Sequence, residues 1–194
     1  LAIFGGTFDP IHYGHLLIAE QVYDNLSVEK VLFMPAGDPP HKTNRSITDA
    51  RHRYRMVQLA IEGNKNFLLS DYELKKRGKS YTADTLRYFK ENKIAENLYF
   101  LIGADSLLEI FHWRDPEFLL ENANFVVVSR PGYSLQDSGL ADKYKPYLKQ
   151  IIFLNTIEVG YSSSQIRELL GEGKSIKYQT PEQVIAYIET YQVY

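Results

Sequence analysis

The 194-residue chain contains no cysteine, which excludes disulfide bonds, thiolate nucleophiles and cysteine-ligated zinc. No apolar run approaches the roughly 20 residues that a membrane-spanning helix needs, so we expect no membrane partner. A surplus of basic residues is also missing, because 22 lysines and arginines against 24 aspartates and glutamates give a net charge of −2. This balance argues against general nucleic-acid binding, although a few local cations can still hold a small anion.

Targeting features are also absent from the sequence. We expect no signal peptide, and because the sequence begins with Leu1 we expect a residue or two to precede it. Together with the lack of cysteine, this favours a protein of the reducing cytoplasm.

Six short apolar segments of strand length recur along the chain. Their residues do not alternate between polar and apolar, which is typical of strands covered on both faces. The segments are 1–4, 31–34, 67–69, 98–102, 125–128 and 151–154. Segments of helical periodicity lie between them, at 15–26, 49–61 and 82–92. This order predicts an α/β fold, a Rossmann-like, doubly wound parallel sheet with right-handed crossovers.

The helical segments also predict which residues face the core. Segment 49–61 carries its apolar stripe on Ala50, Tyr54, Val57 and Ile61. A last helix is expected to open at the capping box Thr180-Pro181-Glu182-Gln183 and to run to about Tyr191. Residues 37–47 and 130–142 are predicted to be the two long loops. No repeat or linker divides the chain, so we expect one domain, residues 1–194.

The stretch FGGTFDPIHYGH, residues 4–15, lies where the first predicted strand gives way to a helix. In doubly wound folds, ligands bind beyond the carboxyl ends of the strands. Gly5 and Gly6 allow unusual backbone dihedrals and bring N–H groups close to a bound group, and Thr7 adds a hydroxyl.

The helix start within this stretch has further features of a phosphate site. His12 and His15 are three residues apart and share one helix face. A helix N-terminus attracts anions, and Gly14 has no side chain to hold a phosphate away. Two other interpretations are a glycine-rich turn with two surface histidines, and a zinc site. For zinc, neither a cysteine nor an obvious third ligand stands beside the histidines.

Residues 5–15 resemble the signature of the nucleotidyltransferase superfamily, whose H-x-G-H motif is shared with class I aminoacyl-tRNA synthetases. A second block, residues 162–167 (SSSQIR), resembles the S-S-T-x-I-R of that superfamily and departs from it at Ser164, which keeps the hydroxyl. The serines of this block also offer an N-cap to a helix, and Arg167 is a planar donor for phosphate. In isolation, the block is more typical of an ordinary capped helix with a solvent-exposed arginine.

Four further segments resemble the bacterial nicotinate mononucleotide adenylyltransferases, so the resemblance covers essentially the whole chain. They are 39–42, 80–86, 102–106 with Trp113 shortly after, and 128–132. Trp113, the only tryptophan, is suited to stack on the cationic pyridinium ring. Backbone N–H groups around Thr82 and near Trp113 are expected to receive the ring carboxylate.

The resemblance implies roles for individual residues. The expected catalytic residues are His12, His15 and Arg167. The expected ATP-binding residues are Gly5, Gly6, Thr7, Phe8, Gly14, Gly103, Asp105, Ser162, Ser163 and Ser164, with Asp105 on a ribose hydroxyl. The expected mononucleotide-binding residues are Lys42, Tyr81, Thr82, Trp113 and Arg130, with Lys42 and Arg130 supplying charge for phosphate. No protein-held metal is expected, because Mg²⁺ should arrive with ATP.

The implied function is adenylyl transfer in NAD biosynthesis. ATP and nicotinate mononucleotide would give nicotinate adenine dinucleotide and pyrophosphate. The alternatives are phosphopantetheine adenylyltransferase, another small-substrate nucleotidyltransferase, or a nucleotide-binding module without activity. Nicotinate is favoured over nicotinamide by the resemblance alone, and the sequence leaves a homo-oligomer open.

Overall fold

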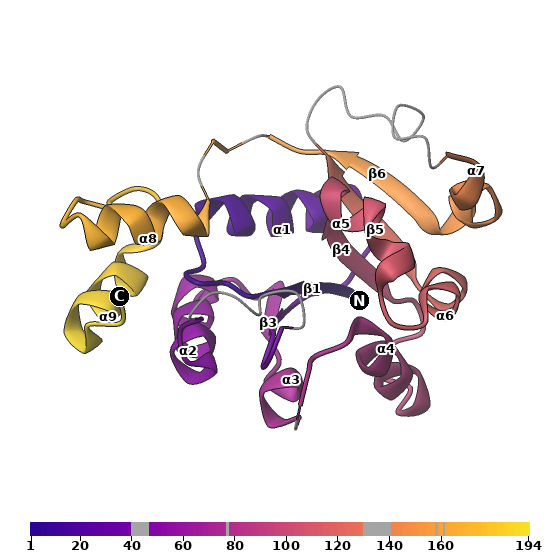
Figure 1. Ribbon diagram of the computed structural model, residues 1–194, viewed down its shortest axis with the longest axis horizontal. Helices are drawn as coiled ribbons and strands as arrows, with labels where there is room; N and C mark the ends of the chain where they lie inside the picture. The colour runs from indigo at the N-terminus through magenta and orange to yellow at the C-terminus, as the bar shows by residue number, and fades with distance from the viewer. Residues whose placement is uncertain (40–46, 77, 130–140, 158, 161) are drawn as a thin grey trace.

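The computed structural model describes residues 1–39, 47–76, 78–129, 141–157, 159–160 and 162–194 (Figure 1). Six strands of this part of the chain form one sheet in the order β3-β2-β1-β4-β5-β6, and all neighbouring strands are parallel. The strands are β1 (Ala2–Gly6), β2 (Val31–Pro35), β3 (Phe67–Leu69), β4 (Tyr99–Gly103), β5 (Asn124–Ser129) and β6 (Ile151–Asn155). The predicted doubly wound parallel sheet is therefore confirmed.

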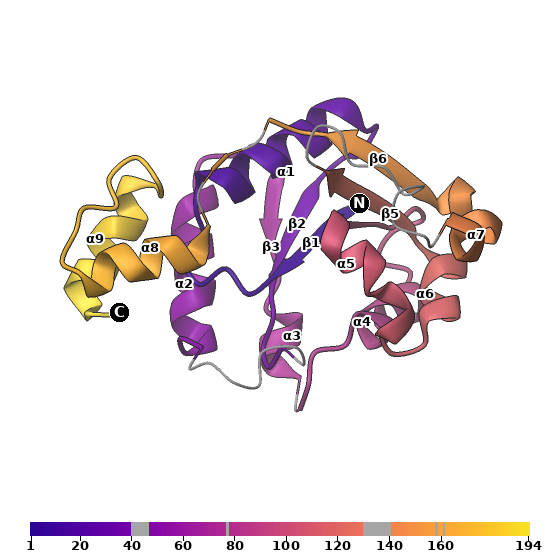
Figure 2. The same ribbon diagram turned by 45° about the horizontal axis from the view of Figure 1, so that its top comes forward.

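Helices connect the strands and cover both faces of the sheet (Figures 1 and 2). The longer ones are α1 (Tyr13–Asn25), α2 (Ala50–Ile61), α4 (Thr82–Glu91), α8 (Ser163–Gly171) and α9 (Glu182–Tyr191). The shorter ones are α3 (Tyr72–Lys75), α5 (Ala104–Leu108), α6 (Pro116–Asn122) and α7 (Ala141–Tyr144), with 3₁₀ turns η1 (Ile110–His112) and η3 (Lys145–Gln150). The described residues include no helix that is long and apolar enough to cross a membrane.

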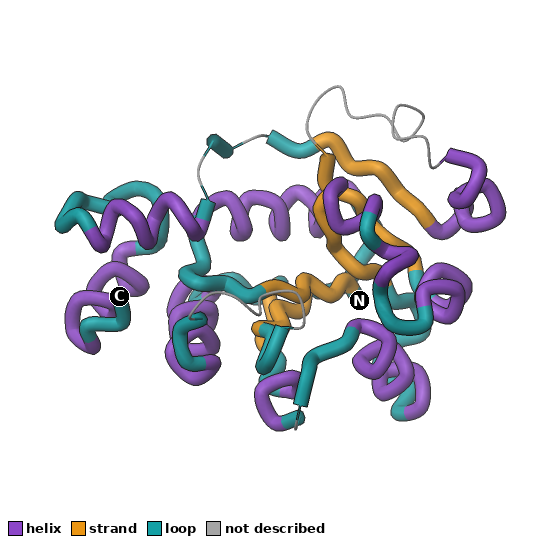
Figure 3. The backbone as a smooth tube through the Cα atoms, viewed as in Figure 1, coloured by secondary structure: helices purple, strands orange, loops and turns teal. Residues whose placement is uncertain are grey.

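The strands bury side chains on both faces because successive residues of a strand point in opposite directions. Ala2 and Phe33 pack into one core, against α1, α2, α8 and α9. Ile3 and Leu32, their neighbours in sequence, pack into the other core, against α4, α5 and α6. Helices thus flank the strands on either side (Figure 3), which is why the strand sequences are apolar without alternation.

Helix α2 is placed as predicted, but its buried face is not the predicted one. Val57 and Ile61 are buried, whereas Ala50 and Tyr54 are only half-buried. The turn facing the sheet carries Arg53, which is 1% exposed, in place of Tyr54. The stripe is shifted because Arg53 finds hydrogen-bond acceptors inside the protein, a possibility that hydropathy alone does not reveal.

The predicted capping box at Thr180 is wrong. Helix α9 begins at Glu182 with Pro181 as its N-cap residue, and no side chain caps it. The hydroxyl of Thr180 is buried and donates instead to the main-chain oxygen of Ile11, 2.8 Å away. Thr180 therefore anchors the segment before α9 to the loop of His12, and Pro181 takes the N-cap position.

The two predicted long loops lie mostly outside the described residues, which omit 40–46 and 130–140. The second prediction, 130–142, extends too far, because α7 already begins at Ala141. At the other end of the molecule, α9 lies beside α2, and α8 lies next to them (Figures 1 and 2). The last segments of the chain are thereby brought to the loop that follows β1.

Candidate active site

A cavity of about 790 Å³ opens at the carboxyl ends of β1 and β4. These two strands are neighbours, and the strand order reverses between them. Crossovers leave such a point in opposite directions, which opens a crevice where doubly wound proteins bind ligands. The residues lining it are Phe4, Gly5, His12, Gly14, His15, Ile18, Leu101, Ile102, Gly103, Ala104, Asp105, Ser106, Trp113, Val128, Thr156, Ile157, Val159 and Ser162.

The two histidines predicted at the helix start lie together in this cavity. Their imidazole rings are stacked, with centroids 3.7 Å apart and an interplanar angle of 26°. Nδ1 of His15 accepts a hydrogen bond from the main-chain N–H of His12 at 3.2 Å. The edges of the Phe4 and Phe8 rings hold the imidazole of His15 in place. The two histidines therefore face one space at the helix start, as predicted, although His12 is the N-cap residue and α1 itself begins at Tyr13.

Burial changes the protonation of His12. The side chain is only 7% exposed, and desolvation lowers the pKa of His12 from 6.5 to about 4. At neutral pH the imidazole is therefore uncharged and offers one N–H donor.

The glycines of the first motif provide space rather than unusual dihedrals. The left-handed conformation in this loop belongs to Phe8, with φ of 50°, and not to Gly5 or Gly6 as expected. A Cβ on Gly6 would lie 2.9 Å from the ring of Phe8, which is 2% exposed. Phe8 thus contributes its side chain to the core, so a ligand can meet only its backbone. Thr7 is half-buried in the same loop and does not line the cavity.

The second motif lies directly against the first. Ser162 lines the cavity and is the N-cap of α8, as predicted, and the structure adds a capping box with Gln165. The hydroxyl of Ser163 donates to the main-chain oxygen of Pro10 at 2.8 Å. Two segments about 150 positions apart in the sequence therefore form one wall.

Arg167 joins this wall without lining the cavity. Its Nη1 donates to the main-chain oxygen of Asp9 and lies 3.9 Å from the Asp9 carboxylate. Its Nη2 donates to the hydroxyl of Ser164 at 3.3 Å. Arg167 and Ser164 are thus close to the segment 5–15 with the two histidines, here called the histidine loop. Their polar groups form hydrogen bonds within the protein, and neither residue lines the cavity.

Arg53 connects three segments beneath the site. Its only signal in the sequence is a basic residue within an apolar helical segment. Its guanidinium donates to the main-chain oxygens of Thr7, Thr48 and Ala36, at 2.8, 2.8 and 2.7 Å, and more weakly to that of Gly37. Burial lowers the pKa of Arg53, but a guanidinium stays charged inside proteins. The loops after β1 and β2 are therefore held together by one buried cation.

Predicted residues from the segment after β4 also line the cavity. They are Trp113, predicted to bind the mononucleotide ring, and Gly103 and Asp105, predicted to bind ATP. Tyr81 is the residue before α4, and the guanidinium of Arg114 lies over its ring at 5.1 Å from the centroid. Tyr81 and Thr82 therefore lie next to the segment of Trp113, although neither lines the cavity.

The structure does not test every predicted site residue. Lys42 and Arg130 lie outside the described residues. Thr156, Ile157 and Val159 line the cavity from the connection between β6 and α8, and sequence reasoning missed them. They carry no motif that would have marked them.

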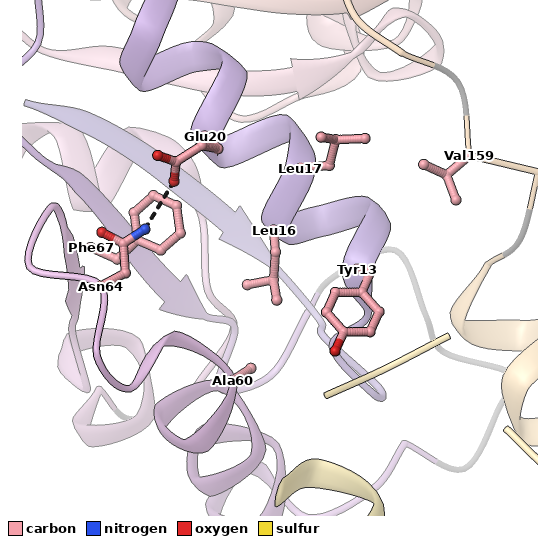
Figure 4. A pocket seen from close by; sticks show the side chains of 8 residues that line it. All are labelled: Tyr13, Leu16, Leu17, Glu20, Ala60, Asn64, Phe67 and Val159. Carbon is pink, nitrogen blue, oxygen red and sulfur yellow. Dashed lines mark hydrogen bonds between the residues drawn. The ribbon is translucent and has the colours of Figure 1, made fainter. Parts of the chain in front are cut away.

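A second cavity of about 430 Å³ lies between α1 and the end of α2 (Figure 4). Its lining is mostly apolar: Tyr13, Leu16, Leu17, Glu20, Ala60, Asn64, Phe67 and Val159. The carboxylate of Glu20 accepts a hydrogen bond from the amide of Asn64 at 2.9 Å (Figure 4). An apolar wall with one anionic group is unsuited to a triphosphate, so the first cavity is the candidate active site.

Known proteins resemble this chain over its full length. Residues 3–169 match the cytidylyltransferase-like family. A protein of Clostridium tetani is 44% identical over 198 residues, covering 100% of this chain and 98% of its own. One of Thermoanaerobacter sp. is 44% identical over 197 residues, covering 100% and 93%. Both are named "Probable nicotinate-nucleotide adenylyltransferase".

Solved structures share the fold. The nicotinic acid mononucleotide adenylyltransferase of Plasmodium falciparum, complexed with NaAD, superposes with a TM-score of 0.78 at 23% identity. That alignment covers 99% of this chain and 95% of the other. The same Plasmodium enzyme complexed with APC gives a TM-score of 0.75 at 24% identity. The resemblance predicted from the two motifs is thus confirmed along the whole chain, and this protein belongs to the nicotinate-nucleotide adenylyltransferase family.

Proposed function

We propose that this protein joins ATP and nicotinate mononucleotide to give nicotinate adenine dinucleotide and pyrophosphate, a step of NAD biosynthesis. The observation that carries the proposal is the single cavity at the end of β1 and β4. It holds the stacked pair His12 and His15 on one wall and Trp113 on another. A triphosphate and a pyridinium ring would therefore be bound in one space.

The proposed reaction is an in-line displacement. An oxygen of the mononucleotide 5′-phosphate forms a bond to the α-phosphorus of ATP. The bond from the α-phosphorus to the bridging oxygen breaks, and pyrophosphate leaves with the electron pair. The attacking phosphate is already an anion at neutral pH, so no general base is needed. The protein's task is to orient the two phosphates and to stabilise developing charge.

The histidines are proposed to donate hydrogen bonds to the α- and β-phosphates of ATP. Because burial keeps the pKa of His12 at about 4, its contribution is a neutral N–H donor in the free protein. Backbone N–H groups of residues 6–8 and the N-terminus of α8 are proposed to assist. The contact proposed between Arg167 and pyrophosphate requires the guanidinium to use donors beyond those that reach Asp9 and Ser164.

Magnesium is proposed to arrive with ATP. Among the described residues, no group of three His, Cys, Asp or Glu side chains is arranged to hold a metal ion. Mg²⁺ commonly binds substrate phosphates and keeps several waters, which suits a site of this kind.

The protein is further proposed to act in the cytoplasm as one domain, residues 1–194, on small nucleotides rather than nucleic acid. The net charge of −2 supports small nucleotides as substrates, because proteins that bind nucleic acid usually carry basic patches. Cell fractionation tests the location.

The function is tested by incubating the purified protein with Mg-ATP and one second substrate at a time, and measuring dinucleotide and pyrophosphate. Nicotinate mononucleotide should give stoichiometric amounts of both products, and nicotinamide mononucleotide much less. Turnover of phosphopantetheine in place of either mononucleotide would overturn the proposed substrate. If ATP binds but no second substrate leads to release of pyrophosphate, the protein is a nucleotide-binding module instead.

A further inference from the structure

Tyr194 returns from the end of α9 to the loop that carries His12. Helix α9 ends at Tyr191, and Gln192 then turns the chain with φ of 48°. The N–H of Val193 donates back to the main-chain oxygen of Ile188. This turn lets the hydroxyl of Tyr194 donate to Oδ1 of Asp9 at 2.8 Å.

Asp9 is the point where four segments meet. Its side chain is 4% exposed, so its carboxylate must be satisfied by hydrogen bonds within the protein. Oδ1 accepts from Tyr194, and Oδ2 accepts from the main-chain N–H of Thr48 at 3.5 Å. Its main-chain oxygen accepts from Arg167. Asp9 therefore couples the histidine loop to the start of α2, to α8 and to residue 194.

The hydroxyl of Tyr194 is suited to be a permanent donor. Burial and the carboxylate of Asp9 raise the pKa of Tyr194 far above its usual range, so the phenol stays protonated. Tyr194 as a residue is 37% exposed, and its hydroxyl also forms a side-chain hydrogen bond with Thr48. Its contact with Asp9 is thus made at the edge of the loop that carries His12 rather than in the core.

We propose that Tyr194 is a positioning residue for adenylyl transfer, which acts through Asp9 on the loop of His12 and on Arg167. This inference rests on the proposed function for its kinetic readout. Without the hydroxyl, one oxygen of a buried carboxylate loses its donor, and the Asp9 side chain turns toward another, Arg167 being 3.9 Å away. Arg167 and the loop backbone then leave the arrangement in which ATP meets the histidines.

The test is Tyr194→Phe, with Tyr187→Phe as its matched control. Tyr187 lies in α9 and forms a hydrogen bond of similar length, 2.9 Å, to Nδ1 of His52, away from the cavity. Tyr194→Phe should lower kcat about tenfold, because sub-ångström misplacement of phosphate-binding groups is costly. Its KM for the mononucleotide should stay within about twofold, since Trp113 is untouched. Tyr187→Phe should keep the wild-type kcat.

A double-mutant cycle with Asp9→Asn separates positioning from general stability. If Tyr194 acts through Asp9, Tyr194→Phe should have little further effect on kcat in the Asp9→Asn background. Independent, multiplicative losses would overturn the inference, as would a wild-type kcat in folded Tyr194→Phe. Equal losses in Tyr194→Phe and Tyr187→Phe would also overturn it, because they would reflect the stability of α9.

Calorimetric titration with a non-hydrolysable ATP analogue distinguishes this inference from the proposed function. Tyr194→Phe should weaken binding about tenfold, and Tyr187→Phe should leave it unchanged. If the wild-type protein forms no dinucleotide but the analogue still binds more weakly to Tyr194→Phe, the function is wrong and the positioning role stands. Equal affinity in all three proteins would refute the positioning role.

Discussion

A Cβ atom placed on Gly14 would lie 2.9 Å from Nδ1 of His12 and 3.7 Å from the side chain of Val159. Gly14 therefore allows the buried imidazole to lie flat against the first turn of α1. Its φ angle is not in the left-handed region, so the glycine is required for space alone.

Gly14→Ala should lower kcat by about 10- to 100-fold, because the new methyl group displaces the ring of His12. Stability should change little, since alanine favours helices and offsets part of the clash. Steady-state kinetics and thermal unfolding check this. Gly171→Ala at the end of α8, where a Cβ meets nothing within 4 Å, is the control and should retain full activity. Full activity in both variants would show that the His12 ring position is unimportant.

His15→Ala should lower kcat by about 10²–10³, which is typical for the loss of one donor to a transition state. The imidazole stacks on His12 in the cavity and is held by two phenylalanine rings, so its geometry suits that role. Turnover at saturating ATP and mononucleotide is the measurement. His112→Ala, whose side chain is 76% exposed, should leave turnover unchanged. Unchanged turnover in folded His15→Ala would remove His15 from the mechanism.

Trp113→Ala should raise the KM for nicotinate mononucleotide about tenfold and leave the KM for ATP nearly unchanged. The reason is the loss of an indole face for the cationic ring, a contact of about 0.5–2 kcal/mol. Trp113→Phe keeps an aromatic face and should recover most of the affinity. If the KM for ATP rose as much as that for the mononucleotide, Trp113 would be a general wall of the cavity instead.

Arg53→Met should lower the free energy of unfolding by about 3 kcal/mol or more, because it leaves several buried main-chain oxygens without donors. Chemical denaturation of the purified variant gives the value. The control is Arg51→Met, two residues earlier in the chain. It removes a guanidinium that is 89% exposed and paired with Asp49, so it should change stability little. Similar stabilities of the two variants would show that the carbonyls of the loops find other donors.

Acid should destabilise the protein between about pH 6.5 and pH 4 through His12. Burial lowers the pKa of His12 in the folded state to about 4, whereas the unfolded chain titrates near 6.5. The stabilising contribution is therefore complete above pH 6.5 and is lost as the pH falls toward 4, about 3 kcal/mol in all. Denaturation of wild type and His12→Gln at several pH values isolates this contribution. Parallel pH profiles for the two proteins would contradict it.

What the sequence predicted correctly depends on local patterns. The N-cap at Ser162 needs only a serine before a helical segment, and a parallel sheet follows from alternating apolar and helical segments. The stacked histidines likewise follow from their spacing at a helix start.

What the sequence could not predict depends on partners far away in the chain. The hydroxyl of Thr180 caps no helix and donates to the backbone of Ile11. Arg53 takes a core position because main-chain acceptors from three loops surround its guanidinium. No prediction was attached to the carboxylate of Asp9, and only the folded chain shows which groups donate to it. Such choices are decided by hydrogen-bond satisfaction in the packed state, which no local pattern encodes.

The hydrogen bond between Tyr194 and Asp9 spans 185 positions of the chain. During synthesis, the residues of all six strands, which end at Asn155, are added before Tyr194, so the sheet can form before this hydrogen bond does. A growing chain can thus form its sheet while the carboxylate of Asp9 still lacks one of its hydrogen-bond donors.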